Sequence, residues 1–260
     1  MKDKGELQAL KTELSRGGRQ VMLLSETDST NRVAKAWAME NPGRRAVVMA
    51  DRQTAGRGRL GRKWCSAEGN LYISFVYEAP LPPEQLSALT LAAAMAADDT
   101  VQALGAKSGI KWPNDIYAGG KKLVGILCEG VLRGGCMASV VVGIGINVRQ
   151  TEFESEVADV ATSLALLTEK DHTPMEVACL LAEKLDARVE QFFRGGFAAM
   201  REEYTARSIL LGRPVSAAVP QPVEGICVGF SPEGDLLLKT QGGTLPVRTG
   251  EVVGKLGFKK

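Results

Sequence analysis

Residues 50–64 read Ala-Asp-Arg-Gln-Thr-Ala-Gly-Arg-Gly-Arg-Leu-Gly-Arg-Lys-Trp, with three glycines and five cationic side chains against the single carboxylate of Asp51. Glycine leaves room for backbone N–H groups to approach a phosphate, and arginine adds permanently charged donors for phosphate or carboxylate oxygens. The same composition is typical of a solvated surface loop. The stretch therefore predicts either a flexible surface loop or a basic flap over an anionic ligand.

Residues 56–61 also match the pattern Gly-x-Gly-x-x-Gly, which indicates a dinucleotide site only where a helix follows. Here residues 70–77 follow, and their alternating aromatic and β-branched side chains predict a strand. No Gly-Lys-Ser/Thr sequence closes the loop, so it is not a Walker A loop either. We therefore interpret the loop as a mobile basic flap between two strands, 45–50 and 70–77.

The composition bounds the class of protein. The chain has 260 residues, 45% hydrophobic and 24% charged, with a formal net charge of +2. These values predict a soluble globular protein with one large and one small domain, whose basic character is local. The charged N-terminus predicts no signal peptide, and the longest apolar run, residues 86–97, is too short to span a membrane. Five cysteines without C-x-x-C spacing predict a cytoplasmic protein with no disulfide framework and no zinc site.

The chain contains one histidine, His172, within a polar run. We expect it to be an exposed loop residue. A single histidine argues against Ser-His-Asp hydrolysis, Cys-His catalysis and histidine-bound metals. The chemistry is therefore expected to depend on lysine, arginine, aspartate, asparagine and backbone groups.

Periodicity and end signals predict the remaining elements. Strands are expected over residues 21–24, 45–50, 70–77, up to Pro113, 121–129 and 137–143, and helices over 5–18, 31–40, 82–104, 174–194 and 197–206. Thr173-Pro174-Met175-Glu176 is a capping box with proline at the first helical position. From Gly212 the sequence changes to short β-runs over 214–219, 224–231, 235–240, 244–249 and 251–254. These runs predict a small barrel of about 45 residues, SH3-like in size, after a boundary at 210–212.

Two polar clusters have both a structural and a functional interpretation. Ser29 or Thr30 is a natural N-cap for the helix over 31–40, but a helix N-terminus lined with hydroxyl and amide groups can also hold a polar ligand. A second set lies at strand ends or turns of one sheet: Lys111, Asn114, Asp115, Lys122 and Asn147. Turn chemistry and surface lysines would explain these residues singly. Their convergence in an apolar context favours a binding site.

Together these motifs resemble those of bacterial biotin protein ligases. The resemblance rests on Ser29-Thr30-Asn31, the loop from Gln53 to Trp64, Lys111-Trp112-Pro113-Asn114-Asp115, Lys121 to Leu127 and Gly143 to Asn147, and it extends over residues 20–258. It implies an α/β (α+β) fold related to class II aminoacyl-tRNA synthetases, with a mixed sheet and a C-terminal SH3-like barrel. The implied organisation is a short N-terminal helical segment over 1–19, a catalytic domain over 20–210 and a barrel domain over 211–260.

The resemblance also implies a two-step reaction. Biotin and MgATP give biotinyl-5′-adenylate and pyrophosphate, and the biotinyl group then passes to a lysine of a biotin carboxyl carrier protein domain. The residues implied to bind biotin are Ser29, Thr30, Asn31, Gln53, Arg57, Gly58, Arg59, Lys122 and Gly125. Those implied to face ATP are Arg59, Arg62, Trp64, Lys111, Asn114, Asp115, Lys122 and Asn147. The implied catalytic residues are Lys122, Arg59, Lys111 and Asp115, with no metal-binding residue among them; Arg248 and Glu251 lie in a stretch that approaches ATP in relatives.

This chemistry agrees with the residues present. Adenylation joins two anions, so cations and N–H donors suffice and no nucleophilic side chain is needed. A glycine-rich loop that closes would protect the labile adenylate from water. The alternatives are a lipoate or octanoate ligase and a nucleic-acid-binding protein. Residues 1–19 are too few for a helix-turn-helix, so we expect no repressor role, no DNA and no membrane as partners; a homodimer is possible.

Overall fold

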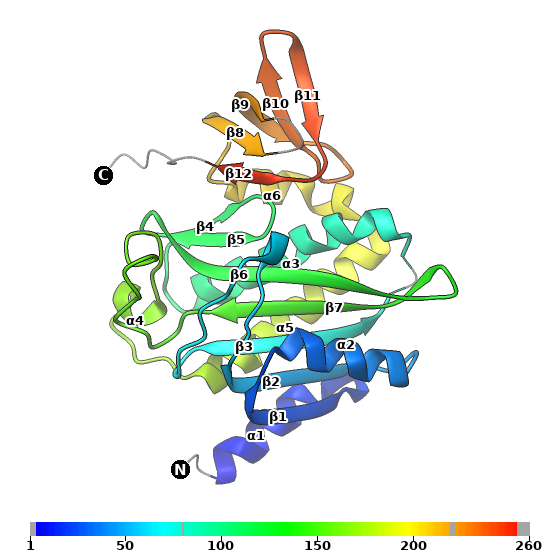
Figure 1. Ribbon diagram of the computed structural model, residues 1–260, viewed down its shortest axis with the longest axis vertical. Coiled ribbons are helices and arrows are strands. Elements are labelled where there is room, and N and C mark those ends of the chain that lie inside the picture. Colours follow the sequence, from blue (N-terminus) through cyan, green and yellow to red (C-terminus); the bar gives the residue numbers. More distant parts are fainter. Residues whose placement is uncertain (1–3, 80, 219–221, 254–260) are drawn as a thin grey trace.

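A computed structural model of the chain describes residues 4–79, 81–218 and 222–253. The predicted strand ends at residues 219 and 254, and the predicted extension of the barrel domain to 260, lie outside these residues. The described chain forms a seven-stranded sheet followed by a separate five-stranded sheet (Figure 1).

The large sheet is mixed, as predicted. Its strands are β1 (Gln20–Thr27), β2 (Ala46–Gln53), β3 (Leu71–Glu78), β4 (Ser108–Lys111), β5 (Asp115–Ala118), β6 (Lys121–Arg133) and β7 (Cys136–Ile146), in the order β1-β2-β3-β7-β6-β5-β4. β1 and β2 are parallel, and every other neighbouring pair is antiparallel. β5, which is four residues long, is not among the strands predicted from the sequence.

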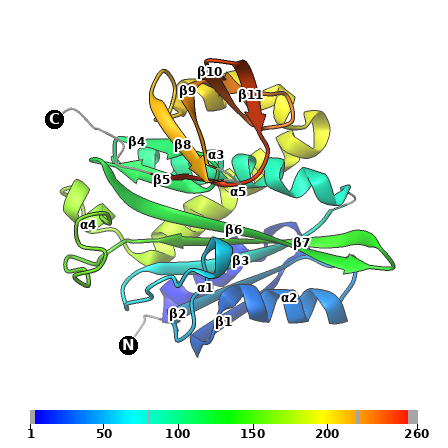
Figure 2. The same cartoon turned by 45° about the horizontal axis from the view of Figure 1, so that its top comes forward.

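Helices cover both faces of this sheet (Figures 1 and 2). They are α1 (Lys4–Leu14), α2 (Thr30–Glu40), α3 (Leu86–Ala103), α4 (Leu164–Leu167), α5 (Pro174–Gly195) and α6 (Arg201–Arg207). α2 packs on one face, where Val48 and Val76 are buried, whereas α3 and α5 cover the other, where Val47 and Phe75 are buried. This alternation follows from the two-residue period of a strand. Within the described chain, no helix combines the length and apolar character needed to cross a bilayer.

Several helix ends differ from the prediction. The helix expected over 5–18 ends at Leu14, because Gly17 and Gly18 adopt φ of 69° and 72°, which an α-helix does not accommodate. The helices expected from residues 82 and 197 each begin with a short 3-10 segment, so α3 starts at Leu86 and α6 at Arg201. The N-cap at Thr173 and the proline at the first helical position are confirmed, since Thr173 Oγ1 accepts a hydrogen bond from the backbone N–H of Glu176, whereas the Glu176 carboxylate accepts one from Lys170.

The prediction for His172 is wrong. Its side chain is buried, with 2% of its surface exposed. Nε2 lies 3.0 Å from the carbonyl oxygen of Leu104, at the C-terminus of α3, to which it donates a hydrogen bond. The ring therefore satisfies a helix-terminal carbonyl, which explains how a polar residue in a polar run becomes buried.

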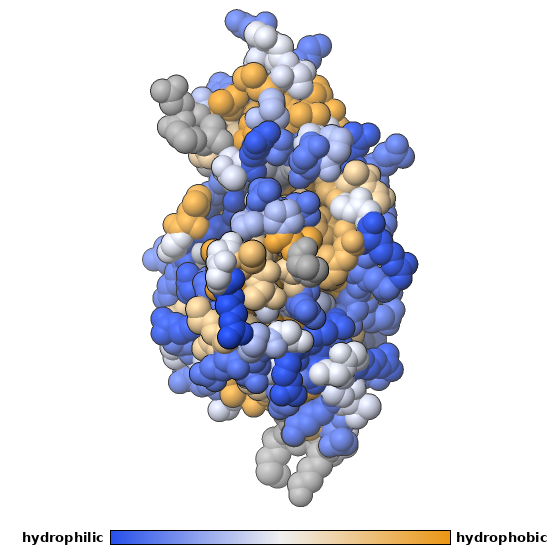
Figure 3. Space-filling model, turned by 90° about the vertical axis from the view of Figure 1, so that its right-hand side faces the viewer, coloured by the Kyte–Doolittle hydropathy of each residue, from blue (hydrophilic) through white to orange (hydrophobic). Residues whose placement is uncertain are grey.

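The small sheet contains β8 (Pro214–Ala218), β9 (Val223–Phe230), β10 (Leu236–Thr240), β11 (Gly243–Val247) and β12 (Glu251–Val253). Its order is β11-β10-β9-β8-β12, and all pairs are antiparallel, as expected for an SH3-like barrel. The barrel is tied to the large part of the chain by a hydrogen bond of 3.1 Å from Trp112 Nε1 to the Gly234 carbonyl and by an edge-to-face contact of Tyr204 with Phe230. In the view of Figure 3, apolar side chains gather on the surface of the barrel.

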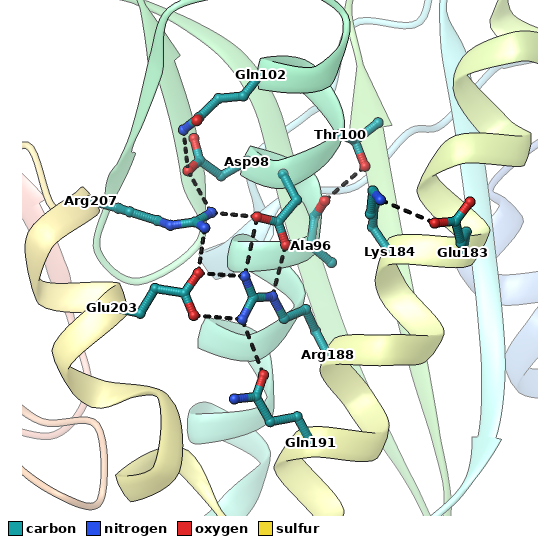
Figure 4. A network of polar contacts seen from close by, with 11 residues as sticks. Ala96, Asp98, Thr100, Gln102, Glu183, Lys184, Arg188, Gln191, Glu203 and Arg207 are labelled. Carbon is teal, nitrogen blue, oxygen red and sulfur yellow. Dashed lines mark hydrogen bonds and ion pairs between the residues drawn. The ribbon is translucent and has the colours of Figure 1, made fainter.

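A network of ion pairs joins α3, α5 and α6 (Figure 4). Arg188 Nε donates to Asp99 Oδ2 at 2.8 Å, and its Nη2 donates to Glu203 Oε1 at 2.6 Å. Arg207 pairs with Asp98, Asp99 and Glu203. Burial alone would raise the pKa of Asp99, but hydrogen bonds from Arg188 and Arg207 lower it; the hydrogen bond from Arg188 likewise lowers the pKa of Glu203.

We expect Arg188→Ala to lower the free energy of unfolding by about 2–4 kcal/mol, because it leaves the partly buried carboxylates of Asp99 and Glu203 to share the single charge of Arg207. Denaturant unfolding at pH 7 measures this change. Since the folded-state pKa values of Asp99 and Glu203 are lowered, the effect should be present above the unfolded pKa values of about 4 and fade as the pH falls below them. Arg194→Ala, at an exposed ion pair with Glu190, serves as the control and should cost less than about 1 kcal/mol. An equal loss in the two variants would contradict a stabilising role for the network.

Candidate functional site

The basic loop lies on the face of the large sheet that also carries α2, in front of β6 and β7 (Figures 1 and 2). It connects β2 to β3, as predicted, and it is folded back on itself. Gly58 N–H donates to the Arg62 carbonyl at 2.7 Å, and Trp64 N–H donates to the Gly56 carbonyl at 2.9 Å. These bonds make the loop a compact cover above the sheet.

Glycines in the two central strands make room for this cover. A Cβ added to Gly125 would lie 2.5 Å from the indole ring of Trp64, and one added to Gly145 would lie 2.7 Å from it. Likewise, a Cβ on Gly143 would lie 1.9 Å from Oδ1 of Asn31. Any larger residue would push these side chains away, so Gly125 and Gly145 set how closely the loop approaches the sheet and Gly143 sets how closely α2 does.

A cavity lies between the loop and the sheet. All residues predicted to bind biotin line it, and so do six of those predicted to face ATP: Arg59, Arg62, Trp64, Asn114, Asp115 and Lys122. The lining also includes residues that sequence analysis did not assign to the site: Leu60, Lys63, Tyr72, Ile126, Leu127, Gly143, Ile144 and Gly145. Glu251 of the barrel completes the wall.

One end of the cavity is polar and uncharged. Gln53 Oε1 accepts hydrogen bonds from Thr30 N at 2.8 Å and from Thr30 Oγ1 at 3.1 Å. Ser29 occupies the N-cap position of α2, but its side chain makes no capping hydrogen bond. The capping interpretation therefore does not account for the Ser29 hydroxyl, which lines the cavity.

The other end is charged. Lys122 Nζ lies 2.6 Å from Asp115 Oδ1 and 5.4 Å from the centre of the Trp64 ring. Arg59 Nη1 donates to the Gly250 carbonyl at 3.2 Å, and Arg62 forms an ion pair with Glu251. Burial lowers the pKa of Arg59. The barrel thus holds the basic loop at this end, where several cations converge on a small volume.

Two predicted residues, Lys111 and Asn147, do not line this cavity. Lys111 pairs with Asp115 in the β4–β5 register, and burial lowers its pKa. Asn147 lies after β7, and its Nδ2 donates to the Thr162 carbonyl at 2.9 Å. Arg248 also lies outside it, 83% exposed, with Nε 3.6 Å from Asp235 Oδ2. Lys111 is therefore adjacent to the charged end through Asp115, whereas Arg248 is not part of it.

Asn147 instead lines a second, more apolar cleft that shares Lys63, Trp64 and Lys122 with the first cavity. Its other lining residues are Cys65, Gln150, Phe153, Val157, Val160 and Ala161. Backbone hydrogen bonds from Lys122 N to the Val160 carbonyl, at 2.7 Å, and from Thr162 N to the Lys122 carbonyl, at 2.9 Å, hold this wall against β6. The cleft was not predicted from the sequence, although apolar residues at 153, 157 and 160 within an acidic segment were a usable signal.

Comparisons with known proteins agree with this arrangement. The sequence matches the biotin/lipoate A/B protein ligase family over residues 23–147. It is 37% identical over 246 residues to the biotin--[acetyl-CoA-carboxylase] ligase of Mycobacterium tuberculosis, covering 91% of this chain and 90% of the relative. It is 33% identical over 248 residues to the bifunctional ligase/repressor BirA of Bacillus subtilis, covering 94% of this chain and 76% of the relative.

Comparison of the fold with solved structures also identifies biotin protein ligases. The structure of the biotin protein ligase from Aquifex aeolicus in complex with biotin and ATP matches with a TM-score of 0.78 and 34% sequence identity, over 90% of this chain and 97% of that one. The family match covers the cavity residues from Ser29 to Gly145, and the sequence identity and the shared fold extend over about nine-tenths of the chain. The chain therefore belongs to the biotin/lipoate A/B protein ligase family, among its biotin protein ligases.

Proposed function

We propose that the protein activates biotin with ATP as biotinyl-5′-adenylate and transfers the biotinyl group to a lysine of a biotin carboxyl carrier domain. One observation carries this proposal. A single cavity under the basic loop has an uncharged polar end, at the N-terminus of α2, and a cationic end around Lys122 and Arg59. A neutral head group and a carboxylate, as in biotin, fit these two ends in this order.

Biotin is placed with its ureido group among Ser29, Thr30 and Gln53, whose hydroxyl and amide groups can donate and accept hydrogen bonds. Ile126, Leu127 and Ile144 also line the cavity and offer apolar contacts to a ring system. The carboxylate then points toward Lys122, while Arg57, Gly58 and Arg59 enclose the ligand from above. Asn31 uses both of its Nδ2 protons within the protein, on the Leu127 carbonyl and on Glu129, so we assign it to shaping the wall.

The nucleotide is placed across Lys122. Its α-phosphate lies between Lys122 and Arg59, with Arg62 and Lys111 nearby to balance the remaining phosphate charge. The base enters the apolar cleft beside Phe153 and Val157, because that cleft shares Trp64 and Lys122 with the biotin cavity. Asn147 then faces the nucleoside, Asn114 orients Arg59, and Asp115 positions Lys122.

Two displacements follow from this placement. A carboxylate oxygen of biotin attacks the α-phosphorus, the bond to the β-phosphate oxygen breaks, and pyrophosphate leaves. Lys122 and Arg59 stabilise the charge that develops on the phosphoryl oxygens. The lysine amine of the carrier, after losing a proton, then attacks the acyl carbon, and AMP leaves with the oxygen that came from biotin. The loop limits access of water to the adenylate between the two steps.

Magnesium fits this site as a companion of the nucleotide. In the described part of the chain, no group of three or more histidine, cysteine or acidic side chains could hold a metal without a ligand. Mg²⁺ is typically bound by one or two carboxylates together with substrate phosphates. Asp115 and Glu251 are the carboxylates that line the cavity. When bound there, Mg²⁺ would neutralise phosphate charge.

We also propose two functional domains, a catalytic one over 20–210 and a barrel over 211–260, after the N-terminal segment 1–19. The barrel supplies Gly250 and Glu251, which hold Arg59 and Arg62 of the loop. This contact gives the barrel a role in keeping the loop closed.

The proposal is tested by incubating a biotin carboxyl carrier domain with biotin, MgATP and this protein, followed by intact-mass spectrometry. We expect the carrier to gain one biotinyl group, and omission of ATP to abolish the gain. An unmodified carrier would overturn the proposal. Lipoate in place of biotin discriminates the lipoate-ligase alternative. Biotin with ATP should also raise the melting temperature, whereas lipoate should not.

The charge of Lys111 predicts a pH dependence. Because burial lowers its pKa below the ordinary value of about 10.4, the ammonium form is lost at a lower pH than in a free lysine. We expect kcat/KM for ATP to fall as the pH rises, with the midpoint of this fall below pH 10.4. Lys111→Arg should move this fall to higher pH, because a guanidinium keeps its proton. A pH–rate profile that is identical in the two proteins would contradict a role for the Lys111 charge.

A further inference from the structure

Glu129, a carboxylate in β6, lies beside the cavity and has no part in the proposed reaction. Its side chain is 15% exposed. Asn31 Nδ2 donates to its Oε2 at 2.9 Å, while Lys35 Nζ and Arg57 Nη1 lie 3.7 Å and 3.6 Å from its Oε1. Glu129 therefore contacts α2 on one side and the basic loop on the other.

This contact complements the one made by the barrel. The charged end of the loop is held by Gly250 and Glu251, through Arg59 and Arg62. Arg57, nearer the polar end, forms an ion pair with Glu129, which is part of the sheet beneath. The loop is thus attached at both ends of the cavity. The Arg57 side chain is 51% exposed, so it can leave Glu129 without unfolding the core.

Glu129 is also one end of a chain of polar contacts along the wall. Asn31 connects it to Ser74, whose Oγ donates to Asn31 Oδ1 at 2.7 Å and lies 2.8 Å from Thr30 Oγ1. The backbone N–H of Thr30 in turn donates to Gln53 Oε1 at 2.8 Å. The chain ends at the residues proposed to hold the ureido group. Glu129 therefore connects the side chains of this wall, through Asn31, to Arg57 of the loop.

We propose that Glu129 is a positioning residue that latches the loop over the bound adenylate through Arg57. This inference rests on the proposed function, because it assigns the latch to the same cavity. Glu129 favours the closed loop without contacting the ligand, since its charge attracts Arg57 in a partly buried place where solvent screens the attraction less. The expected consequence is slower escape of the adenylate, not faster chemistry.

The test uses Glu129→Gln, which keeps the size of the side chain and the acceptor for Asn31 but removes the charge. Each protein is incubated with radiolabelled biotin and MgATP, and release of labelled biotinyl-adenylate is followed after a chase with unlabelled biotin. We expect release from E129Q to be about three to ten times faster than from the wild type. Trypsin should also cleave the loop of the ligand-bound variant faster, whereas the rate of adenylate formation should change less than release.

Glu26→Gln is the matched control, because it removes one carboxylate from an exposed ion pair with Arg52, near the start of the same loop. Its release rate should equal that of the wild type. Arg57→Gln, at an exposed side chain, should also release the adenylate faster, and the double variant with E129Q should be no faster than R57Q alone. The latch would be overturned if E129Q released the adenylate at the wild-type rate. It would also be overturned if the effects of the two substitutions on the release rate were additive in the double variant. A wild-type protein that forms no biotinyl-adenylate would instead overturn the proposed function, and the latch with it.

Discussion

Lys122→Ala is expected to reduce the rate of biotinyl-adenylate formation by about a hundred- to a thousandfold, the usual effect of removing a cation or donor aimed at a developing negative charge. Lys122, like Lys63, lines both cavities, and its Nζ lies 2.6 Å from Asp115, which fixes its position. Biotin-dependent exchange of labelled pyrophosphate into ATP measures this step without a carrier protein. The fold should be retained, because Lys122 is partly exposed.

Lys184→Ala is a suitable control for this experiment. Lys184 lies on α5, on the other face of the sheet, and pairs with the neighbouring Glu183 at 3.1 Å. Its loss should leave exchange unchanged. If K122A exchanged pyrophosphate at more than about a tenth of the wild-type rate, the assignment of Lys122 to the α-phosphate would be wrong.

Gly125→Ala is the second substitution with a large expected effect. The added methyl group would lie 2.5 Å from the ring of Trp64, so the indole must move away from the sheet. Since Trp64 forms the wall between the two cavities, this movement displaces the loop and the bound groups together. Misplacement by about 1 Å costs about a hundredfold in rate, and we expect a loss of that order in kcat/KM for biotin.

Gly242→Ala provides the matched control, because the nearest atom to its added methyl group is Thr240 Oγ1 at 3.8 Å, an ordinary contact in the barrel. It should behave as the wild type in the same assay. A change in tryptophan fluorescence in G125A that is absent when Trp64→Phe is also present reports that Trp64, and not Trp37 or Trp112, has moved. A displaced indole combined with normal kcat/KM would show that the wall is not needed for catalysis.

The sequence allowed residues that line the cavity to be predicted wherever a residue's chemistry and its place in a strand or turn agree. Charged residues near strand ends can face a ligand. For this reason the loop with Arg57 and Arg59 could be predicted to lie at the site, and so could Lys122 at the start of β6. The mixed sheet and the barrel followed from periodicity and turns. Gly143 and Gly145 could not be assigned, since the need for a missing Cβ is visible only when Asn31 and Trp64 lie against them.

Contacts between distant segments account for the other differences. His172 is buried because it meets the end of α3, 68 residues earlier in the chain. The apolar cleft at Phe153 forms because residues 160–162 pair with Lys122. Neither contact can be read from the periodicity of the local sequence. The proposed role of Glu129 likewise depends on contacts with Asn31 and Arg57, which belong to a helix and a loop on the same face of the sheet.

The central claim is that a carboxylate and an α-phosphate are joined in the cavity beneath the basic loop. It is tested most directly with biotin labelled with ¹⁸O in its carboxylate, incubated with MgATP, this protein and a carrier domain. Mass spectrometry of the AMP should detect one ¹⁸O atom for each biotinyl group transferred, because the attacking oxygen stays on phosphorus. Biotinylated carrier accompanied by unlabelled AMP would contradict the account.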